Sequence, residues 1–156
     1  MAEIRFYHLT RSRLEEALTR LLRRAIDRHD RVVVMAGSTE RVEALNAHLW
    51  SFDPASFLPH GSARDGNAAE QPVYLTATLG NPNGAKLLML CDAAEAPAAA
   101  DLPAHGFDLV CVLFNGHDAE ALATARATWR TYRAAEQQLV YHQQSEDGAW
   151  VEKARH

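Results

Sequence analysis

Long apolar runs and closely spaced cysteines are the first features that the sequence lacks. No run approaches the roughly 18 apolar residues of a membrane span, and no charged-then-apolar leader opens the chain. The two cysteines, Cys91 and Cys111, lie far apart inside apolar segments. This placement predicts buried free thiols in a reducing compartment. We therefore expect a cytoplasmic protein without membrane contact.

Lysine is also scarce. Lys86 and Lys153 are the only lysines, so nearly all of the positive charge is arginine. With 16 Lys and Arg against 20 Asp and Glu, the formal net charge is -4. An acidic balance argues against a protein that holds nucleic acid through a broad basic surface.

Patterns for metal binding and catalysis are missing as well. The eight histidines form no His-Glu-x-x-His pair, and the chain has neither a Cys-x-x-Cys nor a Gly-x-Ser-x-Gly motif. The segment Gly80–Lys86 falls one residue short of a phosphate loop, lacks a following Ser or Thr, and precedes a strand. We interpret it as a hairpin turn. Asp92, at the end of a strand, could hold magnesium in a degenerate nucleotide hydrolase, but it has no phosphate loop to act with. We expect no catalytic residue, metal or cofactor.

The first half of the chain alternates strands and helices within a length typical of one domain. Ser12 and Glu15 have the form of a capping box, and the helix that follows keeps regular apolar spacing to about Arg28. Gly37-Ser38 opens a second helix, with Val42, Leu45 and Leu49 on its inner side. Parallel α/β packing follows from this order. The predicted strands are residues 3–9, 31–36, 73–77, 86–91 and 109–114.

Three further segments are less regular. We expect residues 61–70 to be mobile, and residues 93–103 to form a loop with at most a short helical turn. Residues 139–143 and 150–152 flank Asp147-Gly148 and predict two short terminal strands joined by a turn. Residues 143–156 are therefore a possible terminal hairpin or extension of the domain.

The stretch from Trp50 to His60 combines two prolines with large apolar side chains, namely Trp50, Phe52, Phe57 and Leu58. Prolines prevent the helix from continuing. Such a loop either covers the core as a lid or presents a docking patch to another protein. The residues alone leave both alternatives open.

A late segment, which Asp118 is expected to cap as a helix, has two unlike faces. At about 100° per residue, Arg126, Trp129, Arg130 and Arg133 share one arc. The opposite arc carries small residues and one tyrosine that suit contact with a sheet, namely Ala121, Ala125, Thr128 and Tyr132. An outward-facing Trp among arginines fits a ligand with carboxylates and an apolar anchor, such as an acidic peptide end. The alternative is a solvated arginine surface whose Trp covers a neighbouring loop.

Three stretches together resemble the chi subunit of bacterial DNA polymerase III. They are Phe6-Tyr7-His8-Leu9, Leu49-Trp50 followed by Ser56-Phe57-Leu58-Pro59-His60, and Ala125-Arg126-(x)2-Trp129-Arg130-(x)-Tyr132-Arg133. The resemblance covers nearly the full length. It implies one three-layer α/β/α domain, mostly parallel in its sheet, similar to nucleotide-binding folds but without a phosphate loop.

The resemblance also implies a non-catalytic adaptor in DNA replication. Chi pairs with the psi subunit of the clamp loader and holds the acidic C-terminal tail of single-stranded-DNA-binding protein, so it reaches DNA only indirectly. The tail would lie on Arg126, Trp129, Arg130 and Arg133, with Asn115 as a wall of the pocket and Leu122 where a basic residue can occur. The psi subunit would contact the loop with Trp50, Phe52, Phe57 and Leu58, which favours the docking alternative.

Overall fold

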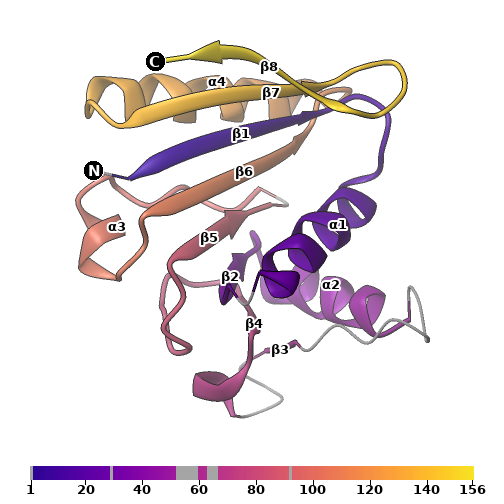
Figure 1. The fold of residues 1–156 in the computed structure, drawn as a ribbon, viewed down its shortest axis with the longest axis vertical. Coiled ribbons are helices and arrows are strands. Elements are labelled where there is room, and N and C mark those ends of the chain that lie inside the picture. The colour runs from indigo at the N-terminus through magenta and orange to yellow at the C-terminus, as the bar shows by residue number, and fades with distance from the viewer. Residues whose placement is uncertain (1, 29, 52–59, 63–66, 92) are drawn as a thin grey trace.

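One eight-stranded sheet organises the protein, with strand order β3-β4-β2-β5-β6-β1-β7-β8. The computed structural model describes residues 2–28, 30–51, 60–62, 67–91 and 93–156. Figure 1 shows the sheet from β8 at the top to β3 at the bottom. The strands are β1 Glu3–Leu9, β2 Val32–Met35, β3 Gly61–Ser62, β4 Val73–Thr76, β5 Leu87–Leu90, β6 Leu109–Asn115, β7 Gln138–Gln144 and β8 Trp150–Arg155. The helices are α1 Leu14–Asp27, α2 Thr39–Ser51, α3 Asp101–Ala104 and α4 Ala119–Ala134, with a 3-10 turn at Ala68–Glu70.

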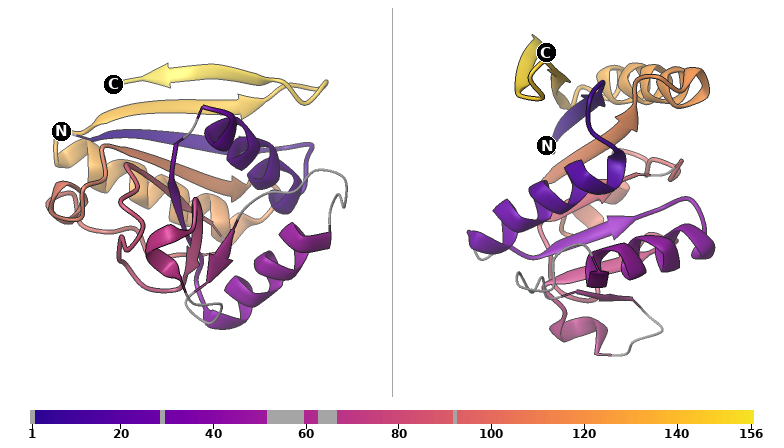
Figure 2. Two further views of the ribbon diagram at one scale, coloured as in Figure 1. Left: turned by 60° about the horizontal axis from the view of Figure 1, so that its bottom comes forward. Right: turned by 90° about the vertical axis from the view of Figure 1, so that its right-hand side faces the viewer.

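Neighbouring strands are parallel throughout, except that β7 and β8 are antiparallel. Because strand side chains alternate between faces, each parallel strand supplies both sides of the sheet. In β2, Val32 and Val34 pack with α1 and α2, whereas Val33 and Met35 pack on the side of α3 and α4. The three-layer α/β/α architecture is therefore confirmed. Figure 2 shows how strongly the sheet twists between its two ends.

Most predicted elements are confirmed in place. β1 spans the predicted residues 3–9, and the inner residues of α2, Val42, Leu45 and Leu49, are all buried. The short helical turn expected near residue 103 is α3, and the terminal hairpin is β7 and β8. Both cysteines are buried free thiols. None of the helices in the described part of the chain is long and apolar enough to cross a membrane.

The predicted capping box at the start of α1 is wrong. Arg13 is the N-cap residue and its side chain caps nothing. The Ser12 hydroxyl instead accepts a hydrogen bond of 2.9 Å from Gln144 Nε2 at the end of β7. Gln144, which is buried and far along the chain, thus hydrogen-bonds the serine that the local sequence predicted as the cap of α1.

The predicted hairpin at Gly80–Lys86 is also wrong. β4 and β5 run parallel on the two sides of β2, so the chain between them has to return along one face of the sheet, past β2, before β5 begins. Asn81 fixes this connection, because Nδ2 donates to the carbonyls of Ala85 at 2.6 Å and His105 at 2.7 Å. The segment is a crossover linker, and it is not a phosphate loop.

Part of the segment expected to be mobile has defined structure. Gly61 and Ser62 form β3 and are buried beside β4, and the 3-10 turn follows at Ala68–Glu70. Two-residue strands carry too little periodicity to be recognised from sequence.

Candidate functional site

Helix α4 carries the predicted site and is anchored at both ends. Asp118 caps it as predicted, since Oδ1 accepts hydrogen bonds from the backbone nitrogens of Glu120 at 3.0 Å and Ala121 at 3.2 Å. Near the other end, the Tyr132 hydroxyl donates to the carbonyl of Pro97 at 2.7 Å. Tyr132 is 1% exposed, and burial raises its pKa to about 12. The small-residue face of the helix therefore lies on the sheet, as the sequence predicted.

Three exposed arginines, Arg126, Arg130 and Arg133, form what we call the arginine face of α4. None of the three has an acidic partner among the described residues. Unpaired guanidinium groups keep all of their hydrogen-bond donors available, and their planar fork matches a carboxylate in bidentate geometry. The helix thus offers a concentrated positive surface on a protein of negative net charge.

The prediction that Trp129 points outward is wrong. Its ring is partly buried against the sheet, with ring centroids 5.2 Å from Phe6, 5.9 Å from Tyr141 and 5.7 Å from His156. Trp129 lies at the boundary between the two arcs of the helix, and β7 and β8 extend the sheet beneath that boundary. It therefore forms a wall between the arginines and the core instead of a free anchor.

Two more rings continue this aromatic patch along the sheet. His8 Nδ1 lies 2.6 Å from the Tyr141 hydroxyl, and the His8 ring is tilted against Phe114 with centroids 5.0 Å apart. We call Phe6, His8, Phe114, Trp129, Tyr141 and His156 the aromatic cluster. The cluster and the arginine face are adjacent parts of one surface, because the Arg126 charge acts on both His8 and Tyr141.

Electrostatics around His8 favour its neutral form. Burial lowers the pKa of His8, and the nearby His117 and Arg126 lower it further. Burial raises the pKa of Tyr141, while Arg126 opposes that rise. A neutral imidazole beside a neutral phenol supplies hydrogen-bonding capacity without adding a charge to the arginine face.

Gly116 allows His8 to lie in this position. A Cβ at Gly116 would collide with the His8 ring and would come 2.8 Å from the carbonyl oxygen of Leu9. The Gly116 backbone nitrogen also donates to that carbonyl at 2.8 Å. The turn after β6 is therefore packed directly against the end of β1.

The other residues predicted for the tail site and the psi interface do not belong to the arginine face or the aromatic cluster. Leu122 is partly buried and packs against the core on the α4 side of the sheet. Asn115, at the end of β6, accepts a hydrogen bond from the His117 backbone at 3.0 Å and lines a separate cleft. Trp50 belongs to the last turns of α2. The other predicted psi contacts, Phe52, Phe57 and Leu58, lie outside the described residues, as does Asp92.

His8, Tyr141 and His156 were not predicted from the sequence to be parts of this surface. The alternation of side chains along a strand could have placed His8 and Tyr141 on the same face of the sheet as Phe6. Ile4, Phe6 and His8 share one face of β1, and Leu139 and Tyr141 share the same face of β7. Their meeting with Trp129 depends on the order of the strands, which no local pattern reveals.

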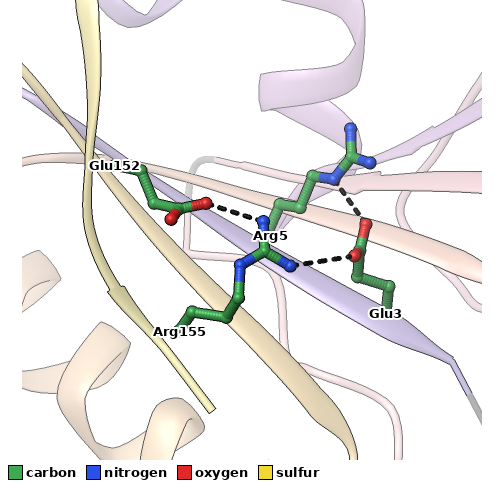
Figure 3. A network of polar contacts seen from close by, with 4 residues as sticks. All are labelled: Glu3, Arg5, Glu152 and Arg155. Carbon is green, nitrogen blue, oxygen red and sulfur yellow. Dashed lines mark hydrogen bonds and ion pairs between the residues drawn. The ribbon is translucent and has the colours of Figure 1, made fainter.

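The opposite face of these strands carries charges that are paired with one another. Arg5 contacts Glu3 at 2.6 Å, and Arg155 contacts Glu152 at 2.7 Å and Glu3 at 4.0 Å. Figure 3 shows these four side chains linked in one chain of contacts across β1 and β8. We call this group the charged network.

The fold and the surface define a class, namely a three-layer α/β protein with a mostly parallel sheet and an exposed arginine face on a late helix. Residues 1–140 match the protein family described as "DNA polymerase III chi subunit, HolC". The chain therefore belongs to the chi subunit family of DNA polymerase III.

One relative is the "Probable DNA polymerase III subunit chi" of Rickettsia prowazekii (strain Madrid E), which is 32% identical over 90 residues. The alignment covers 58% of this chain and 54% of that protein. The chain thus spans about half the length of the relative it matches. The turn after β7 and the whole of β8 lie beyond the residues that match the family.

Proposed function

We propose that this protein is a non-catalytic adaptor of the DNA polymerase III holoenzyme, acting in the cytoplasm during DNA replication. It links the clamp loader, through the psi subunit, to the acidic C-terminal tail of single-stranded-DNA-binding protein. DNA is reached only indirectly, through that protein. Membership of the chi family supports an accessory role in the polymerase complex. The observation that carries the proposal is the arginine face without acidic partners among the described residues, beside the partly buried Trp129.

Charge supports an acidic ligand. Three guanidinium groups within three turns of one helix repel each other unless an anion lies between them. A hydrogen bond to a charged group contributes about 1.5–3 kcal/mol before the tail's ordering is counted. Such contacts together with an apolar contact at Trp129, less the ordering of a flexible tail, suit a micromolar complex of about -8 kcal/mol.

The aromatic cluster supports an apolar residue at the end of that ligand. Trp129 is held by ring contacts with Phe6, Tyr141 and His156, so its rotamer is restricted before any ligand arrives. A rigid aromatic wall binds with little further loss of side-chain entropy. A terminal phenylalanine could therefore pack beside Trp129 while the tail's carboxylates meet Arg126, Arg130 and Arg133.

Binding of a labelled acidic tail peptide ending in Phe tests the proposal. We expect micromolar affinity for the wild type and a loss of about tenfold or more in Arg126→Ala and in Trp129→Ala. Arg20→Ala is the matched control, because Arg20 is an exposed arginine of α1 on the other side of the sheet. An unchanged affinity in both site variants, or no binding by the wild type, would contradict the proposal.

A titration with a bare single-stranded oligonucleotide separates the adaptor from a direct nucleic-acid-binding protein. We expect the wild type not to bind the oligonucleotide. Binding that is lost in Arg126→Ala would instead indicate direct contact of the arginine face with nucleic acid.

The psi interface needs its own experiment, namely co-purification of the psi subunit with the wild type and with Phe57→Ala. Retention of psi by the wild type and its loss in the variant are expected. Retention by both would move the interface elsewhere.

A further inference from the structure

We infer that the cleft at the carboxyl edge of the sheet binds a phosphorylated small molecule of nucleotide size. This site is distinct from the arginine face. It lies where β1, β2, β5 and β6 end, and it has a volume of about 850 Å³. Small-molecule sites commonly measure about 300–1,000 Å³, so the cleft is large enough for such a ligand.

The topology puts the cleft where open α/β sheets bind ligands. β1 and β2 lead into α1 and α2 on one face, whereas the adjacent β6 and β5 lead into α4 and α3 on the other. Connections that diverge to opposite faces leave a crevice outside the carboxyl ends of the strands. The cleft is lined by residues from each of these four strand ends or the turns that follow them.

Two arginines supply the contact for an anion, in a lining that also carries the carboxylates of Glu15, Asp118 and Glu120. Arg11 and Arg13 line the cleft from the connection between β1 and α1, and both are exposed. Neither has an acidic partner among the described residues, whereas Arg41, also in the lining, lies 3.4 Å from Glu15. The fork of a single guanidinium group can bind phosphate in bidentate geometry.

The connection that carries these arginines is held in a fixed conformation. The backbone nitrogens of Thr10, Arg11 and Ser12 all donate to Gln144 Oε1, at 3.1, 2.9 and 3.0 Å. Gln144 is 5% exposed and also donates to the Ser12 hydroxyl. His117 Nε2 lies 2.7 Å from the Thr10 carbonyl and joins the connection to the end of β6. A preorganised connection loses little entropy when a ligand binds.

The other walls suit the rest of a nucleotide. Leu90, Val112 and Phe114 are buried residues whose outer edges form the apolar part of the lining, against which a ring could pack. Asp118 lines the opposite wall and uses Oδ1 to cap α4, which leaves its second oxygen to accept a hydrogen bond from a sugar hydroxyl. A ligand with an anionic end and a hydroxyl-bearing end therefore matches the cleft better than a bare anion does.

The test is a titration of the 15N-labelled full chain with adenosine 5′-monophosphate, and separately with inorganic phosphate and with adenosine. We expect the monophosphate to bind with a Kd of about 1 mM or tighter, and each fragment to bind more weakly. Shifts should appear in the backbone amides of residues 10–13 and 115–118. The double variant Arg11→Ala/Arg13→Ala should bind about tenfold more weakly while keeping its circular dichroism spectrum.

Arg20→Ala/Arg24→Ala is the matched control, because both arginines are exposed on α1 but lie outside the lining. An equal loss in the control would reduce the effect to general charge and overturn the inference. Absence of shifts at about 10 mM monophosphate, or shifts confined to residues 126–133, would also overturn it. The acidic tail peptide should bind Arg11→Ala/Arg13→Ala as tightly as the wild type, so the two proposals fail independently.

Discussion

The two faces of the sheet region formed by β1, β7 and β8 carry their charges in different states. On one face, the charged network pairs Arg5 and Arg155 with Glu3 and Glu152. On the other, the arginine face of α4 has no acidic partner among the described residues, although the same strands support it. Paired charges at a surface add little to stability and little to binding, whereas unpaired ones keep their attraction for an external anion. The contrast supports the proposal that an acidic partner would bind the arginine face.

The aromatic residues follow the same division. Tyr7 stacks on His142 and meets Trp150 at 5.0 Å on the face of the charged network. Trp129 meets Phe6, Tyr141 and His156 on the arginine face. Each face thus has one partly buried tryptophan. Substitutions of Trp129 and Trp150 therefore allow the contribution of a ring to stability to be measured separately from its contribution to peptide binding.

Charge reversal gives the largest expected difference between the faces. Arg126→Glu should weaken binding of the acidic tail peptide about a hundredfold, or about 2.7 kcal/mol, because it replaces attraction by repulsion. Arg5→Glu on the other face should change the affinity less than about twofold. Fluorescence anisotropy of the labelled peptide measures both. Equal losses would show that only the net charge of the protein matters.

Truncation of the two tryptophans should separate stability from binding. We expect Trp129→Ala and Trp150→Ala each to lower the free energy of unfolding by about 2 kcal/mol, because each removes a partly buried ring. Urea unfolding measures this loss. Only Trp129→Ala should also weaken the tail peptide, by about tenfold in a titration of the folded protein. The comparison fails if Trp150→Ala weakens the peptide as much.

The change of stability with pH should be smaller than the loss caused by either tryptophan truncation. It should come from one histidine on each face, His8 and His142. Burial lowers the pKa of His8, aided by His117 and Arg126, and burial lowers the pKa of His142, aided by Arg5. The unfolded chain therefore binds protons more readily than the folded protein, and stability should fall as pH drops below about 6.5. Urea midpoints at about pH 7.5 and pH 5.5 measure the fall. The double variant His8→Gln/His142→Gln should show a shallower fall, and an unchanged slope would contradict this assignment.

Removal of the Arg155–Glu152 ion pair should have the smallest effect on the free energy of unfolding. Glu152→Ala leaves Arg155 with its 4.0 Å contact to Glu3, and the side chains of Arg155 and Glu152 are 62% and 45% exposed. We expect a loss of about 0.5 kcal/mol in the free energy of unfolding and no change in peptide affinity. Thermal unfolding and the peptide titration check both values. A stronger peptide complex in this variant would show that the charged network also influences the tail.

The sequence by itself determined most of the elements and the general character of α4. Apolar runs such as residues 32–35 predicted buried parallel strands, and Asp118 predicted the start of α4, because these signals depend on neighbours in the chain. Arg126, Arg130 and Arg133 were placed on one exposed face by helical spacing alone. The two predicted terminal strands around Asp147-Gly148 also follow from local turn chemistry.

Tertiary structure decided which distant side chains meet. Whether Trp129 faces solvent or the sheet depends on β7 and β8 extending beneath α4, and whether Ser12 caps α1 depends on Gln144 arriving from β7. The linker at Gly80–Lys86 is a crossover because β4 and β5 are parallel, and it passes β2 because β2 lies between them. Strand order is set by the burial of whole faces against helices from other parts of the chain. No pattern within a few residues carries that information.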